Sequence, residues 1–155
     1  MPKINEALKE VVINNRRFHI GKMTAKTGSW LLYKLMAELR KIMQPGDGDT
    51  PSAPIVEMTD EQKKEVAEDM TRVSVTVMLQ NIDRDLFDKV QQHALEVCSE
   101  FKMVGEEEVL LPVLMANGNF SNPDLRYDIQ TISNLTSQSL MANLSPFFLN
   151  GGFQN

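Results

Sequence analysis

The ten-residue stretch VVINNRRFHI, residues 11–20, places two β-prone runs on either side of a pair of asparagines. Asparagine tolerates the positive φ angles that the two central positions of a tight primed turn require. The stretch therefore predicts a β-hairpin near the N-terminus, with Asn14 and Asn15 at its turn.

Immediately after this hairpin, the hydrophobic period becomes that of a helix. The helical pattern begins at Thr24, and its apolar stripe comprises Leu32, Leu35, Met36, Leu39 and Met43. Trp30 and Leu31 widen this stripe. The helix begins either at Thr24, tolerating Gly28, or at Ser29 as an N-cap, and Pro45 ends it. Prolines and glycines in the following segment predict an exposed, mobile loop over residues 44–58.

The central part of the chain predicts two further helices. Thr59 and Gln62 have the spacing of a capping box and indicate the start of a long helix with the apolar stripe Val66, Met70, Val73 and Val77. A break is expected near Asn81. Asp83 then caps a second helix with the stripe Leu86, Val90, Ala94, Val97 and Phe101. We expect these two helices to pack against each other in antiparallel fashion.

The C-terminal third predicts an extended run, a turn and a final helix. The run Val109–Met115 contains Pro112, which cannot donate to a strand ladder, so it is expected to be an edge strand or an extended segment. The dipeptide Asn117-Gly118 marks a tight turn. The last helix is expected to begin at Asn122-Pro123 and to end at Pro146, which would release the tail 146–155.

Length and composition favour one globular domain. With 155 residues, 42% of them hydrophobic and 24% charged, the chain can bury a substantial core. The predicted fold class is α+β, mainly α: a small helical domain over residues 1–145 with an N-terminal β-hairpin, followed by an apolar, aromatic tail over residues 146–155. A signal peptide and a transmembrane segment are not expected. The single cysteine, Cys98, is compatible with a reducing cytosol.

Motifs for catalysis or metal binding fail on geometry. Asp47 and Asp49 have some of the character of a calcium loop, but the twelfth position counted from Asp47 is Met58, which cannot ligate calcium. If they shared a helix, His93 and Cys98 would lie about 140° apart around it, so they would not face each other as base and nucleophile. We therefore expect no enzyme activity, no catalytic residues, no cofactor and no metal site.

Charge is distributed unevenly along the chain. Residues 1–44 carry nine Lys or Arg against three acids, and residues 45–155 carry seven against eighteen, so the two parts have net charges of +6 and −11. This asymmetry is compatible with solvated faces, with a basic surface for nucleic acid, or with attraction between the two parts or between subunits. The basic residues are scattered, so nucleic acid is not the expected partner.

The uncharged C-terminal tail holds Phe147, Phe148, Leu149 and Phe153. Burying one such side chain gains roughly 1.5 to 3 kcal/mol, and fixing each backbone residue costs roughly 1 to 2 kcal/mol. Docking of the tail is therefore marginal. Two interpretations stay open: the tail covers the protein's own core, or it contacts a partner.

The order of these parts resembles that of the tail assembly chaperones of long-tailed bacteriophages. The residues that carry the resemblance are a short hairpin ending in Phe18-His19-Ile20-Gly21-Lys22-Met23, a helix ended by Pro45, a polar linker, paired helices, and a terminal element with the pattern Asn143-x-x-x-Phe147-Phe148. The resemblance implies a non-enzymatic protein that binds and solubilises the tape measure protein and helps to recruit tail tube subunits. It also implies a location in the cytoplasm of the bacterial host and absence from the mature virion.

The expected partner-binding residues lie at the edges of the predicted elements. They are expected to be exposed, and they are Trp30, Leu31, Phe147, Phe148 and Phe153. Adaptable Leu and Met surfaces would suit an apolar helix of a tape measure protein bound in a groove. Self-association is left open. The alternatives are a small nucleic-acid-binding or regulatory phage protein, and a structural subunit of the tail or connector.

Overall fold

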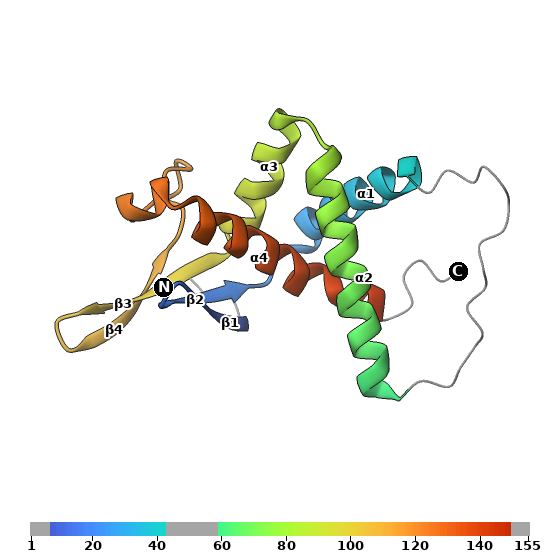
Figure 1. Ribbon diagram of the computed structural model, residues 1–155. Helices are drawn as coiled ribbons and strands as arrows, with labels where there is room; N and C mark the ends of the chain where they lie inside the picture. The colour runs from blue at the N-terminus through green and yellow to red at the C-terminus, as the bar shows by residue number, and fades with distance from the viewer. Residues whose placement is uncertain (1–6, 43–58, 150–155) are drawn as a thin grey trace, which may run out of the picture.

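The computed structural model describes residues 7–42 and 59–149, in which a four-stranded sheet packs against helices (Figure 1). The elements in chain order are β1 Ala7–Ile13, β2 Arg16–Gly21, α1 Ala25–Ile42, α2 Asp60–Asn81, α3 Arg84–Leu95, β3 Cys98–Val104, β4 Glu107–Pro112, the 3₁₀ helix η1 Pro123–Tyr127, and α4 Ile129–Leu149. The α+β, mainly α, fold class is confirmed. The expected mobile loop 44–58 and Phe153 lie outside the described residues.

The sheet is antiparallel with strand order β1-β2-β3-β4. Asn14 and Asn15 have φ angles of 51° and 64°, and Ile13 pairs with Arg16 across them. Positive φ at both central positions is the signature of a type I′ turn, whose twist matches that of the flanking strands. The predicted N-terminal hairpin is therefore confirmed.

The segment Cys98–Val104 is a strand, and the prediction that the third helix continues to Phe101 is wrong. The helix ends at Leu95, and β3 pairs with β2 through Phe18 opposite Glu100 and Ile20 opposite Cys98. This pairing satisfies the backbone of β2 on its second edge, which a longer helix would leave without a partner. The predicted edge strand is confirmed, since β4 lies at the end of the sheet and carries Pro112 as its last residue.

The helix α1 begins one residue after Thr24, whose hydroxyl accepts a hydrogen bond from the backbone N–H of Thr27 at 3.2 Å. The capping box of α2 is formed as predicted: the Thr59 hydroxyl accepts from the Gln62 N–H, and the Gln62 side chain accepts from the Thr59 N–H. Asp83 caps α3 as predicted by accepting from the Leu86 N–H. These caps fix where the helices begin.

The predicted buried face of α2 is wrong. Val66, Met70 and Val73 are 42%, 51% and 61% exposed. The buried residues of α2 are mostly small: Ala67, Thr71, Ser74, Val75 and Met78. Small side chains allow α2 to approach its neighbours closely. Those neighbours are chiefly α4 and α1, so the expected pairing of α2 with α3 is also wrong.

The last helix differs from the prediction at both ends: it begins at Ile129 and not at Asn122-Pro123, although Asn122 is an N-cap as predicted. Asn122 caps a short 3₁₀ helix through the Asp124 N–H, and Asp128 then accepts from the Thr131 N–H at the start of α4. Pro146 does not end α4, which continues through it to Leu149. Phe147 and Phe148 therefore belong to the last turn of a helix, whereas the sequence predicted a tail that starts at Pro146.

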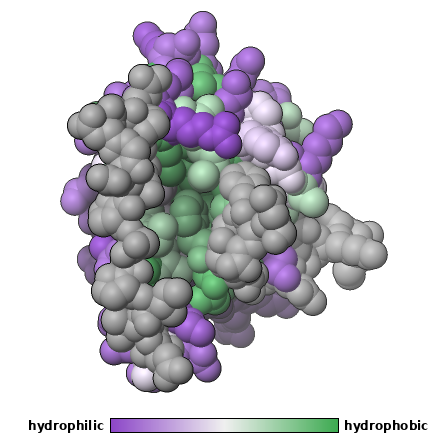
Figure 2. All heavy atoms as spheres, turned by 90° about the vertical axis from the view of Figure 1, so that its right-hand side faces the viewer, coloured by the Kyte–Doolittle hydropathy of each residue, from purple (hydrophilic) through white to green (hydrophobic). Residues whose placement is uncertain are grey.

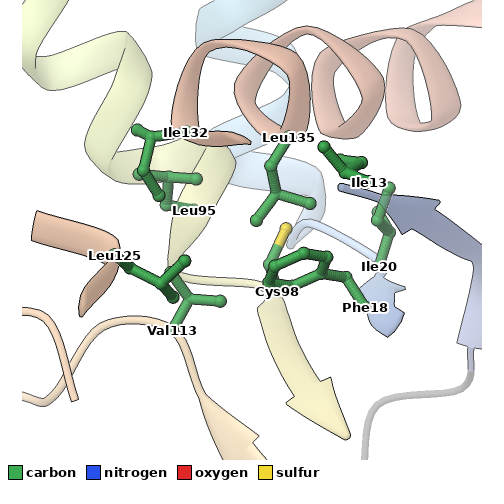
Figure 3. Packing of buried hydrophobic residues seen from close by; sticks show 9 residues of the cluster. All are labelled: Ile13, Phe18, Ile20, Leu95, Cys98, Val113, Leu125, Ile132 and Leu135. Atoms are coloured by element: carbon green, nitrogen blue, oxygen red, sulfur yellow. The ribbon is translucent and has the colours of Figure 1, made fainter. Parts of the chain in front are cut away.

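Two clusters of buried residues form the core. The first lies between the sheet and the first half of α4, and Figure 3 shows its residues: Ile13, Phe18, Ile20, Leu95, Cys98, Val113, Leu125, Ile132 and Leu135. The second lies among the helices and comprises Leu31, Leu35, Val75, Met78, Val90, Ala94, Leu140 and Leu144. Both α3 and α4 contribute to the two clusters, so these two helices join the sheet to the rest of the helical core.

Candidate partner-binding surfaces

The last turn of α4 lies between α1 and α2. Phe147 lines a pocket of about 260 Å³ with Met23 of the β2–α1 connection and with residues of α1, among them Leu32. Pro146 and Leu149 line a second pocket of about 190 Å³ with Ala67 of α2. Figure 2, viewed from this end of the molecule, shows hydrophobic residues gathered in a hollow. The C-terminal end of α4 is thus flanked by apolar depressions on two sides.

Asn143 holds this end of α4 in place. Its side-chain Oδ1 accepts from the Met23 N–H at 2.8 Å, and its Nδ2 donates to the Gly21 carbonyl at 3.2 Å. Nδ2 also donates to the Ser139 carbonyl one turn earlier in α4, at 3.0 Å. A single amide therefore fastens the β2–α1 connection to α4, and this sets the position of Phe147 relative to α1. The sequence pattern Asn143-x-x-x-Phe147-Phe148 contains Asn143 but does not predict these hydrogen bonds.

The sequence-predicted contact residues are only partly brought together. Phe147 and Phe148 are half-buried and lie edge to face, with ring centroids 5.6 Å apart. Phe148 packs against the helical core cluster. Trp30 is also half-buried, but its ring lies edge to face with that of His93 of α3, with ring centroids 5.4 Å apart.

The expected exposure of Leu31 is wrong. Leu31 has no exposed surface, because it packs in the core cluster shared by α1, α2, α3 and α4. It is therefore not available as a contact residue in this fold.

A second apolar surface lies on α2, on the face that the sequence predicted to be buried. Val66, Met70 and Val73 are exposed and Val77 is half-buried, and together they define what we call the α2 stripe. Their successive separations of four, three and four residues are those of a heptad seam. The sequence shows this spacing, but a buried face has the same spacing, and periodicity alone cannot distinguish a buried stripe from an exposed one.

Two arginines of β2 form ion pairs that stabilise the sheet. The Arg16 guanidinium contacts the Glu100 carboxylate at 2.5 and 2.8 Å. Burial opposes ionisation of Glu100, but the hydrogen bonds and charge of Arg16 outweigh it and hold the pKa of that carboxyl below its usual value. Arg17 pairs with Glu108 at 2.5 Å and with Glu10 at 3.6 Å. The pairs with Glu100 and Glu108 neutralise part of the basic surplus of the N-terminal region, which weakens the case for a nucleic-acid surface.

The thiol of Cys98 is a packing group. Burial raises its pKa to about 12, so it stays protonated at neutral pH and is a poor nucleophile. Across residues 7–42 and 59–149, the structure contains no group of three or more His, Cys, Asp or Glu side chains that could hold a metal ion. What the α2 stripe and the end of α4 offer is apolar contact with another protein.

Comparison with known proteins agrees with a role in contacting other proteins. A family of phage tail assembly chaperone proteins matches residues 14–154, almost the whole chain. The chain belongs to this family. No curated protein and no solved structure matches the chaperone significantly. None of the helices in the described part of the chaperone is long and apolar enough to cross a membrane.

Proposed function

We propose that this chaperone binds the tape measure protein of its phage, keeps it soluble and helps to recruit tail tube subunits to it, without enzymatic activity. The α2 stripe carries the proposal, because it is an exposed row of apolar side chains at heptad spacing on a well-capped helix. Such a row fits the apolar seam of a partner helix. The second half of α2, from Val73 to Asn81, is uncharged, so this part of the seam can be covered without burying a charge.

The magnitudes argue for more than one contact per chaperone. Burying the exposed part of each stripe residue contributes about 1 kcal/mol, hence about 3 kcal/mol for Val66, Met70 and Val73 together. The loss of translational and rotational freedom on association costs roughly 4 to 15 kcal/mol. The stripe alone does not offset this cost. We therefore assign a second contact to the end of α4, where Phe147 and Leu149 line the two apolar pockets and Phe148 lies between them in the chain.

The test is coexpression of the chaperone with the tape measure protein. The wild-type chaperone should keep that protein in the soluble fraction and copurify with it. A variant with Met70→Ser and Val73→Ser should lose both effects, because it places two polar groups in the seam. Its melting temperature should stay close to that of the wild type, since both side chains are more than half exposed.

A matched control has the same substitutions on another surface. Val12 and Met115 are 69% and 46% exposed and lie outside α2, so Val12→Ser with Met115→Ser should leave copurification intact. Equal binding by the two double variants would refute the role of the stripe. A tape measure protein that stays insoluble with the wild-type chaperone would refute the proposed function itself.

Recruitment and location need separate measurements. The purified complex of chaperone and tape measure protein should retain the tail tube protein in a pull-down, and the tape measure protein alone should retain less. Immunoblots should detect the chaperone in the cytoplasm of infected or induced cells and not in purified virions. Its presence in virions at the level of a structural protein would favour the tail or connector subunit instead.

A further inference from the structure

The hairpin of β3 and β4 extends beyond the rest of the sheet. The pairing of β2 with β3 involves only Phe18 to Ile20 and Cys98 to Glu100, whereas β3 and β4 pair as far as Val104 and Glu107. The outer part of the hairpin is therefore a two-stranded ribbon, and Figure 1 shows it projecting away from the helices. A ribbon of two strands is only marginally stable in water without a further contact.

The end of this ribbon is both acidic and apolar. A two-residue turn at Gly105, with φ of +66°, and Glu106 joins the strands. Met103 and Val104 are each 64% exposed. Glu106 and Glu107 are exposed, and neither forms an ion pair with any residue that the structure describes. We call residues 103–107 the hairpin tip.

A pocket of complementary chemistry lies between α1 and α3. It has a volume of about 360 Å³ and is lined by Lys26, Thr27, Trp30, Lys89 and His93. Lys26 and Lys89 are exposed and likewise make no ion pair within residues 7–42 and 59–149. Trp30 and His93 contact each other edge to face at 5.4 Å and form an aromatic wall. Glu96 is engaged with His93 Nδ1 at 2.9 Å. We call this the basic aromatic pocket.

We propose that the hairpin tip of one copy of the chain docks in the basic aromatic pocket of a second copy. The two glutamates of the tip would meet the two lysines of the pocket, and the thioether of Met103 would meet the ring of Trp30. The hairpin projects from the end of the sheet that lies away from α1 in Figure 1, so one molecule does not fill its own pocket. This contact joins different surfaces of the two copies, which generates rings or open helical assemblies rather than a closed dimer of two identical patches.

The proposal does not depend on binding to the tape measure protein, because it uses neither the α2 stripe nor the end of α4. Its first test is sedimentation velocity of the purified chain from micromolar to near-millimolar concentration. The wild type should form species larger than a dimer, and added salt should dissociate them because the exposed charges are screened. A wild type that stays monomeric over this range, or whose assembly is unaffected by salt, would overturn the proposal.

Paired variants then identify the two surfaces. The variant Glu106→Gln with Glu107→Gln lacks the acidic tip, and the variant Lys26→Gln with Lys89→Gln lacks the basic rim. Each alone should be monomeric, with the circular dichroism spectrum of the wild type, because all four side chains are exposed. An equimolar mixture should form a dimer and nothing larger, since only one intact tip and one intact pocket are then present in each pair.

Charge exchange completes the experiment. A variant that combines Lys26→Glu and Lys89→Glu with Glu106→Lys and Glu107→Lys should assemble again, because both surfaces are reversed together. If it remains monomeric while folded, or if the wild-type assembly is abolished by Met70→Ser with Val73→Ser and not by the tip variants, the proposed contact is wrong. The second result would indicate pairing of two α2 helices instead.

Discussion

Replacing Asn143 with alanine tests the arrangement of the C-terminal end of α4. The substitution removes the bond accepted from the Met23 N–H at 2.8 Å and the bond donated to the Gly21 carbonyl at 3.2 Å. The Gly21 carbonyl ends β2, the Met23 N–H lies in the connection to α1, and both lose their bond to α4. Each lost bond costs about 1 to 1.5 kcal/mol, and the better helix propensity of alanine returns about 0.5 kcal/mol. The expected net loss of stability is therefore about 2 kcal/mol.

The matched control is Asn134→Ala on the same helix. Asn134 is exposed and its side chain makes no hydrogen bond with the described residues, so this change should be neutral or stabilise by about 0.5 kcal/mol. Urea denaturation followed by circular dichroism measures both variants. For a chain of this size, 2 kcal/mol corresponds to a fall of about 4 to 8 °C in melting temperature.

Equal stabilities of the two variants would refute the reasoning, because the bonds of Asn143 would then contribute nothing to the fold. The variant Asn143→Asp gives a further check. When protonated, its carboxyl retains an acceptor for the Met23 N–H and an O–H that can donate to the Gly21 carbonyl in place of the amide. It should therefore be destabilised less than Asn143→Ala at a pH where the new carboxylate is protonated.

Three further predictions concern the core, the sheet and the last turn of α4. Burial raises the pKa of Cys98 from 9.0 to about 12, so only the unfolded thiol ionises as the pH rises above 9. The stability of the wild type relative to Cys98→Ala should therefore fall by about 1.4 kcal/mol per pH unit up to pH 12. Parallel stability profiles of the two proteins against pH would contradict this. The pKa of Glu100 is lowered in the folded protein, so its contribution to stability is present above the ordinary pKa of 4.5 and is lost as the pH falls through the folded pKa. Glu100→Gln should cost about 2 kcal/mol of stability at pH 7 and flatten the acid limb of the profile of stability against pH. Pro146 cannot donate to the carbonyl of Ala142, so Pro146→Ala should stabilise the protein by about 1 kcal/mol in urea denaturation, and a loss of stability would show that the proline is needed to place the last turn.

Short-range features of this protein were determined by the sequence alone. The asparagine turn, the capping box at Thr59, and the caps at Asp83 and Asn122 each depend on residues that are at most three or four positions apart. Hydrogen bonds and φ preferences at that range act before any distant segment is in place, so local sequence is sufficient to predict them. The family resemblance also followed from the order of these local elements.

Features that need a distant partner were decided by the tertiary structure. The sequence of α2 offers two faces at helical spacing, and packing against α4 and α1 selected the one with small residues, which left Met70 and Val73 exposed. Cys98–Val104 forms a strand because β2, about eighty residues earlier in the chain, provides a ladder for it. Pro146 stays within α4 because the following Phe148 and Leu149 contact the core and a pocket on α2, and this contact offsets the one hydrogen bond that proline cannot make.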